Sequence, residues 1–440
     1  MLRPFVRVCA VLPLLAIAAV MAALAQGPAF AQTKEIKIGL IFDQTGPFAG
    51  GGSMASYQGS KYAIDLFNER GGVEGYKVNA IYADAQSKAD VAVNEGERLI
   101  NEQKVDMLMG VFSSAHCVPL SAKVEAAKKF WWATICISSA VFKNKNMQYI
   151  FRSHLHSDQY GWVSCDMLNE ISKAKLGIEP KDLKVAIIHE DGPYGVGVAS
   201  GNESQCKKHG MQIVHKEGYA ASSADLSSMV SKLRRARPDV LLHTGYNPDI
   251  TLFMRQAKEA GLKVKALIGH GAGYGQYEQI AARLGPDINW VFNVDSPDPQ
   301  LIDSKKLTVA GADELKAEMK KRFKAETGSD NPSNTIGIAF NNTWIFLSDV
   351  LPRAIRKHGG IDTEALRKAA AETDIPEGGT LQGYGVKFNP PGHEMANQNA
   401  RSYPIVAQYV DGKTYVVYPI ALKSADPVMP LPATHGLGGN

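Results

Sequence analysis

The sequence predicts an α/β protein of two similar Rossmann-like lobes, each a parallel sheet with helices on both faces. Strand-like and helix-like segments alternate along the chain, as they do in proteins with parallel sheets. The alternation starts again at Asp182 after a first complete series. The 440 residues are enough for two domains of ordinary size, each with its own core. No period of about 20 to 50 residues recurs in the sequence, so a solenoid is not expected.

The first series begins with the strand-like segment EIKIGLIF, residues 35–42, and the turn-rich loop DQTGPFAGGGS. Residues 54–70 carry small and apolar side chains at helical spacing, and a Gly-Gly pair ends that helix. Ser87 and Asp90 have the spacing of a capping box at the start of the next helix. The remaining strand-like segments are YKVNAIYAD, VDMLMG and WWATICI. The last two are short apolar runs that close into polar loops, as buried parallel strands do.

The second series has strand-like segments at residues 182–190, 211–218, 238–245 and 263–269, and helical segments near 195–209, 225–237, 248–260 and 275–284. The last third of the chain departs from this order. Helical segments come first and strand-like segments follow, near residues 311–326, 336–356 and 363–373 and then 383–388, 403–410 and 413–419. Asp411-Gly412 is a good hairpin turn. The tail over residues 421–440 is rich in proline and glycine, and we expect it to be mobile.

The N-terminus predicts export. Arg3 and Arg7 precede an apolar run of 18 residues, and small residues at Ala29 and Ala31 suit a signal peptidase. An uncleaved membrane anchor is the alternative, but much of the run is alanine. We therefore predict a signal peptide over residues 1–31 and a soluble periplasmic protein. No cysteine lies at the junction, so no lipid anchor is expected.

The net charge of the chain gives no indication of nucleic acid as a partner. The net charge is +4 and falls to +2 without the leader's two arginines, which is too small a bias to indicate nucleic acid.

Four cysteines would remain after cleavage: Cys117, Cys136, Cys165 and Cys206. An even number in an oxidising compartment permits disulfides in three pairings, and free buried thiols are equally compatible with a chain of this length.

Candidate binding residues follow the predicted strands, because open parallel sheets bind ligands at the carboxyl ends of their strands. Ser113 and Ser114 lie where a helix should begin, and Ser138 and Ser139 repeat this arrangement one strand later. Free backbone N–H groups at such a position, with a serine hydroxyl, suit a ligand carboxylate. A serine there can equally be a simple helix cap, and the two roles are compatible.

Other chemistries find little support. The stretches GHGAGYG and DGPYGVG lack both the spacing of a dinucleotide fingerprint and the Lys-Ser/Thr of a P-loop. His154, His156 and Asp158 could approach one metal ion, but no second cluster supplies further ligands, so no metal is expected. Histidines of a crossing segment that line a cleft are the simpler interpretation. GxSxG is absent, and the serines near His116 show no orienting acid. We expect no catalytic residues, no cofactor and no enzyme activity.

Five segments in order carry a family resemblance: IKIGLIFDQTGPFAGGG, VDMLMGVFSSAHCVPLSAKVEAAKKFWWATI, IFRSHLHSDQYG, VAIIHEDGPYGVGVA and RPDVLLHTGYNPDITLFMRQAKEAGLKVKALIG. Together they resemble the periplasmic solute-binding proteins of ABC importers for branched-chain amino acids and amides. The resemblance covers nearly the whole mature chain. It implies the type I binding fold, in which two lobes joined by three crossing segments close over a ligand.

The resemblance also implies boundaries and a site. The N-terminal lobe would comprise residues 34–152 and 296–395, and the C-terminal lobe residues 153–295 and 400–420. Hydroxyls of the first lobe would hold the ligand carboxylate, and aromatic side chains of the second would cover it. The matching positions are Ser114 and Ser138, with Ser113, Cys136 and Phe112 near them, and Tyr194 and Tyr246 opposite.

One departure from the family concerns the ligand. Amino-acid binders of this family carry an acid in the loop after the fourth strand of the second lobe, because a buried ammonium needs a partner charge. Here that loop is GHGAGYGQ, which has no acid and offers His270 and Tyr274 instead. The glycines leave room, and Gly50 to Gly52 do so in the first lobe.

We therefore expect a substrate-binding protein that delivers a small organic acid, aromatic acids included, to a membrane ABC permease. We expect it to be a monomer. The alternative within this class is an aliphatic amino acid or amide whose ammonium is met by another group. A ligand-sensing receptor domain is the other alternative, but such a domain should lack a cleavable signal or carry an effector segment.

Overall fold

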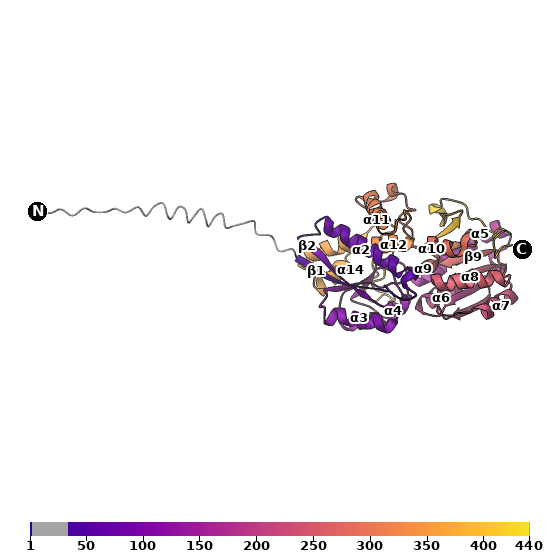
Figure 1. Ribbon diagram of the computed structural model, residues 1–440, viewed down its shortest axis with the longest axis horizontal. Coiled ribbons are helices and arrows are strands. Elements are labelled where there is room, and N and C mark those ends of the chain that lie inside the picture. The colour runs from indigo at the N-terminus through magenta and orange to yellow at the C-terminus, as the bar shows by residue number, and fades with distance from the viewer. Residues whose placement is uncertain (2–33, 440) are drawn as a thin grey trace.

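The computed structural model describes Met1 and residues 34–439. The predicted leader, residues 1–31, lies outside the described residues apart from Met1. Figure 1 shows two lobes side by side, with β1, α2, α3 and α4 in one and α6, α7, α8 and β9 in the other. Among residues 34–439, every helix is too short or too polar to cross a membrane.

The first lobe contains a parallel five-stranded sheet in the order β2-β1-β3-β4-β5. Successive residues of β1 point to opposite faces, so Leu40 packs with α2, α13 and α14 whereas Ile41 packs with α3 and α4. The elements are β1 Lys34–Phe42, α2 Met54–Glu69, β2 Tyr76–Asp84, α3 Ala89–Asn101, β3 Met107–Gly110, α4 Ser114–Ala126, β4 Trp131–Ala133, β5 Ile150–Arg152, α11 Ala312–Thr327, α12 Asn334–Ile345, α13 Leu351–His358 and α14 Thr363–Ala371.

The second lobe contains a seven-stranded sheet in the order β14-β13-β10-β9-β8-β6-β7. Its first five strands in sequence are parallel, but β13 and β14 are antiparallel, because the two-residue turn between them can join only antiparallel strands. The elements are α5 Ser157–Leu176, β6 Lys184–Glu190, α6 Pro193–Lys208, β7 Gln212–Tyr219, α7 Ser227–Ala236, β8 Val240–Thr244, α8 Asn247–Glu259, β9 Ala266–His270, α9 Gly271–Tyr274, α10 Tyr277–Leu284, β10 Phe292–Asp295, β13 Ile405–Val410 and β14 Lys413–Tyr418.

Several elements differ from the sequence-based expectation. The long helix α5 was not predicted, and the helix expected over 336–356 consists of α12, the π-helical turn η6 and α13. The expected strand 383–388 shortens to β12, which pairs only with β11. The bounds of the short elements are η1 Ala49–Ser53, η2 Ser139–Val141, η3 Pro180–Asp182, η4 Gly285–Ile288, η5 Ser304–Lys306, η6 Phe346–Val350, η7 Ile420–Leu422, β11 Asp374–Ile375 and β12 Val386–Lys387.

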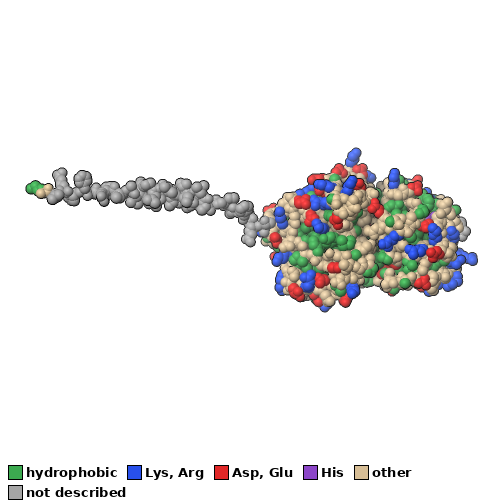
Figure 2. Space-filling model, viewed as in Figure 1, with side chains coloured by type: hydrophobic (Ala, Val, Ile, Leu, Met, Phe, Trp, Pro, Cys, Tyr) green, Lys and Arg blue, Asp and Glu red, His purple; other side chains and the backbone are tan. Residues whose placement is uncertain are grey.

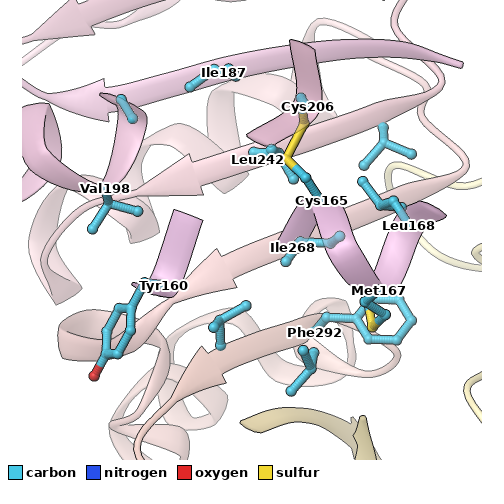
Figure 3. Close-up of a cluster of buried hydrophobic side chains, with 14 of the residues drawn as sticks. Tyr160, Cys165, Met167, Leu168, Ile187, Val198, Cys206, Leu242, Ile268 and Phe292 are labelled. Carbon is cyan, nitrogen blue, oxygen red and sulfur yellow. A yellow bond between two sulfur atoms is a disulfide. The ribbon is translucent and has the colours of Figure 1, made fainter. Parts of the chain in front are cut away.

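Both pairs of cysteines form disulfides. Cys165 and Cys206 join α5 to α6 within the core of the second lobe, near Leu242 and Leu168 (Figure 3). The other bridge joins Cys117 of α4 to Cys136 in the loop after β4. Each lobe therefore contains one covalent link between neighbouring elements.

The C-terminal tail packs on the fold and does not lie free of it, contrary to our expectation. The amide of Leu431 donates to the carbonyl of Lys265 at 2.7 Å, and the amide of Val264 donates to the carbonyl of Leu437 at 2.9 Å. Leu431 and Leu437 are buried in the same apolar cluster as Leu262. The tail's scattered leucines thus anchor a segment whose proline and glycine content suggested mobility.

The chain passes between the two sheets three times, after β5, after β10 and after β12. The first and third of these crossing segments run side by side: the amide of Arg152 donates to the carbonyl of Asn397, and that of Asn399 to the carbonyl of Arg152. The fully buried guanidinium of Arg152 donates to Gln398 Oε1 at 2.6 Å and to the carbonyls of Cys136 and Ser138 at 2.9 and 3.0 Å. One side chain therefore connects two crossing segments to the loop after β4.

Replacing Cys165 and Cys206 together by serine should lower the free energy of unfolding by about 2–4 kcal/mol, because the bridge constrains the unfolded chain. The two cysteines are 41 residues apart, so the loop that they close is long. Denaturant titration followed by circular dichroism measures this loss. The Cys117–Cys136 bridge remains in the variant, so a midpoint equal to that of the wild-type protein would show that the Cys165–Cys206 bridge contributes nothing.

Candidate functional site

A small cavity of about 40 Å³ lies between the two lobes. The loops after β3 and β4, together with α12, contribute the first-lobe residues, and the second lobe and the crossing segments contribute the others. The lining residues are Phe112, Ser114, Ile135, Ile137, His154, Tyr160, Tyr194, Tyr246, Ala272, Asp295, Thr335 and Ile338. Most of them are apolar or aromatic, which suits a small ligand with an apolar body.

The first-lobe wall starts at the turn between β3 and α4. The ring of Phe112 fills the space over Gly52, where a Cβ atom would come within 2.7 Å of it. Ser113 caps α4, its Oγ accepting from the amide of Ala115 at 3.2 Å. Ser114 is the first residue of α4 and lines the cavity, where its Oγ accepts from the amide of Ser138 at 3.2 Å. The ring of Phe112 thus occupies part of the space that we expected Gly50 to Gly52 to leave open.

The loop after β4 contributes two isoleucines and not the side chains that we predicted. Ile135 and Ile137 line the cavity. Between them, Cys136 turns its side chain toward α4 and forms the disulfide with Cys117. Ser138 caps η2, its Oγ accepting from the amide of Ala140 at 3.3 Å. Because adjacent residues in an extended segment point in opposite directions, the isoleucines face the cavity and Cys136 faces away from it.

The second-lobe wall is a pair of tyrosines. The ring centroids of Tyr194 and Tyr246 are 5.4 Å apart, and the Tyr194 hydroxyl donates to the carbonyl of His270 at 2.7 Å. The hydroxyls of Tyr246 and Ser113 are 3.4 Å apart, so this contact joins the two lobes. Burial raises the pKa of both tyrosines well above the ordinary value, so both are neutral phenols.

Two predicted residues lie inside the second lobe, away from the cavity. The ring of His270 lies between Ser164 Oγ and Thr244 Oγ1, each 2.9 Å from a ring nitrogen, and burial lowers its pKa to about 4. Tyr274 folds back over β9, where Gly269 leaves space for its ring, and its hydroxyl is 2.8 Å from His243 Nδ1. Within the stretch GHGAGYGQ, only Ala272 lines the cavity. The polar edges of His270 and Tyr274 are satisfied within the lobe.

The crossing segments contribute an acid that the sequence analysis did not assign to the site. Asp295 is 4% exposed, and its Oδ1 accepts from the Tyr160 hydroxyl at 2.7 Å and from the amide of Ser296 at 2.8 Å. Burial raises the pKa of this carboxyl group. The family resemblance implied a crossing segment at this position. Crossing segments border the cleft, so an acid on one of them could have been predicted to reach the ligand.

His154 also lines the cavity from a crossing segment, as the sequence-based interpretation of these histidines expected. It is 1% exposed, and its Nδ1 has no hydrogen-bond partner among the described residues. Burial and the charge of Arg152 lower its pKa to about 3, so the imidazole is neutral. His156 points elsewhere, its Nδ1 lying 3.3 Å from Ser139 Oγ. Within residues 34–439, no group of three or more His, Cys, Asp or Glu side chains could hold a metal ion.

Comparisons with known proteins agree with this architecture. The profile of the periplasmic binding protein family matches residues 35–408. The chain is similar to Leu/Ile/Val-binding protein homolog 7 of Brucella suis, with 32% identity over 406 residues that cover 92% of this chain and 96% of the relative. Homolog 8 of Brucella abortus is 32% identical over 387 residues, which cover 88% of this chain and 91% of the relative.

Solved structures share the fold at low sequence identity. A branched-chain amino acid transporter substrate binding protein from Streptococcus pneumoniae, in complex with isoleucine, superposes with a TM-score of 0.69 at 18% identity, over 88% of this chain and 100% of the other. An ABC transporter solute binding protein from R. palustris, in complex with benzoate, has a TM-score of 0.68 at 16% identity, over 87% and 95%. The chain belongs to the periplasmic binding protein family and is an ABC-transporter substrate-binding protein of the Leu/Ile/Val-binding type.

Proposed function

We propose that the protein is exported, captures a small organic acid in the interlobe cavity and delivers it as a monomer to a membrane ABC permease. The observation that carries this proposal is the cavity wall at the start of α4, where Ser114 lies beside an otherwise apolar surface. The two lobes would close over the ligand and open to release it.

The carboxylate would lie against Ser114. The first N–H groups of a helix have no partner within the helix, and the helix dipole favours a negative charge there. The hydroxyl of Ser114 accepts from the Ser138 amide and can itself donate to the ligand. These groups are neutral hydrogen-bond donors, which favours a small anion held without a counter-charge.

The body of the ligand would lie among aromatic rings. Phe112 and Tyr246 have ring centroids 6.0 Å apart, and Phe48 lies 4.7 Å from Tyr246 on another side. The loop after β9 presents the methyl group of Ala272 to the cavity, so it supplies no acid for an ammonium group. An amine-free acid with a flat apolar body, of the kind that benzoate represents, suits the chemistry of this lining. The cavity of about 40 Å³ is too small to hold it, so the lobes would have to part to admit the ligand.

An aliphatic amino acid is the second candidate, and Asp295 is the observation that favours it. Its buried carboxyl group lines the cavity from the second crossing segment and could accept hydrogen bonds from an ammonium group. The Leu/Ile/Val-binding relatives add support to this candidate. The two candidates differ in whether Asp295 is charged next to the ligand.

A thermal-shift screen of the refolded, ligand-free protein should distinguish the two candidates. A ligand at about 100 times its dissociation constant stabilises the folded state by roughly 2.7 kcal/mol, because it binds only that state. We expect benzoate to raise the melting temperature and leucine and isoleucine to leave it unchanged. Stabilisation by leucine or isoleucine alone would favour the amino-acid candidate.

Ser114→Ala should weaken benzoate binding by about 1–3 kcal/mol, because the ligand carboxylate loses a buried hydrogen bond. The matched control is Ser121→Ala on the same helix, since Ser121 is buried, donates to the carbonyl of Val118 and does not line the cavity. Isothermal titration calorimetry measures both affinities. Equal losses in the two variants would place the carboxylate elsewhere.

Asp295→Asn separates the candidates by charge. For an amine-free acid, benzoate affinity should stay the same or increase, because a neighbouring carboxyl group that repels the ligand is gone. In the wild-type protein, the affinity should fall as the pH rises through the raised pKa of Asp295, since the carboxylate forms above that value. The variant should lose this pH dependence. Loss of leucine binding in the variant would instead identify Asp295 as the partner of an ammonium group.

A further inference from the structure

A second and much larger hollow, which we call the hinge groove, lies beside the cavity. Its volume is about 740 Å³, within the range of small-molecule sites. The second crossing segment forms its floor, from Asn293 to Leu301, and Asp295 lines both the groove and the cavity. The start of α2, the start of α10, the turn between α11 and α12, and the β13–β14 hairpin form its walls. Figure 1 shows α11 and α12 above the junction of the lobes.

The hinge groove is separated from the cavity by a hydrogen bond between the lobes. Gln276 Nε2 donates to Thr335 Oγ1 at 2.5 Å, and both side chains are buried. Gln276 lines the groove and Thr335 lines the cavity, so the bond lies between the two spaces. The groove therefore borders the cavity of the proposed organic acid, and Asp295 belongs to both linings.

Negative charge predominates among the ionisable residues of the groove. Asp295, Asp298 and Glu278 line it, against one cationic side chain, the exposed Lys413. Burial, together with the nearby charge of Asp295, raises the pKa of Asp298 to about 6. Two carboxyl groups that oppose each other's ionisation are stabilised when a cation lies between them.

The groove also holds buried acceptors without donors. Asn293 is 3% exposed and lines the floor, and its Oδ1 has no hydrogen-bond partner among the described residues. Asn334 Oδ1 and Ser333 Oγ, from the start of α12, are buried and unpartnered in the same way. A buried acceptor without a donor is costly, so a ligand with N–H donors would gain from these groups where a shift of the lining brings them within its reach.

Aromatic rings complete the lining. The ring centroids of Tyr277 and Tyr409 are 4.4 Å apart, and both residues line the groove, with Phe323 on α11. Aromatic faces attract cations and pack against the carbon chain that carries them. A metal ion has no carbon chain to pack against these rings, whereas an organic cation would use the acids for its charge and the rings for both its charge and its chain.

We propose that the hinge groove is a second binding site, and that it takes an organic cation with more than one N–H donor, such as an alkyl diamine. One nitrogen lies between Asp295 and Asp298, and the carbon chain lies against Tyr277 and Tyr409. This proposal does not rest on the identity of the ligand in the cavity.

Calorimetric titration at low salt tests the site, with putrescine as the probe and the neutral diol of the same chain length as its control. Putrescine should bind with a stoichiometry of one, and the diol should not bind. Asp298→Asn should weaken putrescine binding about tenfold or more, because it removes a charge next to the ligand. The matched control is Asp182→Asn, an exposed carboxyl group outside the groove, which should change the affinity by less than about twofold.

A second pair of variants tests the site without altering a buried group. Lys413→Glu at the rim should tighten putrescine binding several-fold, whereas Lys181→Glu, also exposed but outside the groove, should not. The proposal would be overturned if Lys413→Glu and Lys181→Glu changed the affinity for putrescine equally, or if putrescine and the diol bound equally well. Benzoate titrated into Asp298→Asn should bind as in the wild-type protein, since Asp298 does not line the cavity; this separates a failure of the groove from a failure of the organic-acid proposal.

Discussion

The buried guanidinium of Arg152 holds together the region between the lobes. It donates to Gln398 on the third crossing segment and to two carbonyl groups of the loop after β4. Gln398 in turn donates to the carbonyl of His154, which lines the cavity. The guanidinium also lies over the ring of Phe142, 4.7 Å from its centroid. A buried cation without a carboxylate at hydrogen-bond distance depends on such partners, so these acceptors must keep their positions. The first-lobe wall of the cavity depends on them.

The sequence was sufficient to predict the two-lobe fold, because parallel strands and their helices alternate in a way that periodicity shows directly. The turn at Asp411-Gly412 predicted that β13 and β14 pair antiparallel. The sequence could not show that β13 joins β10 antiparallel, since that direction depends on where the crossing segment delivers the chain. The helix α5 went unpredicted because its apolar residues, Cys165 and Leu168 among them, are interspersed with serines and charges.

For the site, the rule that ligands bind at strand ends led to the loops, and the family resemblance led to Phe112, Ser114, Tyr194 and Tyr246 within them, which the structure brings to one cavity. The rule gives the loop but not the direction of each side chain. His270 and Tyr274 lie in such a loop, but both side chains point into the lobe. There His270 contacts the hydroxyl of Thr244, and Tyr274 contacts the imidazole of His243. Asp295 was missed because it lies on a crossing segment, and its position in the cavity follows from the packing of both lobes around it.

The disulfide between Cys117 and Cys136 has a consequence for how a ligand would be held. It ties the first turns of α4 to the loop after β4, so the serine and isoleucine wall is a single rigid unit before any ligand arrives. The tyrosine wall belongs to the other lobe and moves with it. Ordering entropy is then small on the first-lobe side, and the interaction energy of a ligand goes into bringing the lobes together. Dissociation would follow the rate at which the second lobe swings away, while the first-lobe wall keeps its shape throughout.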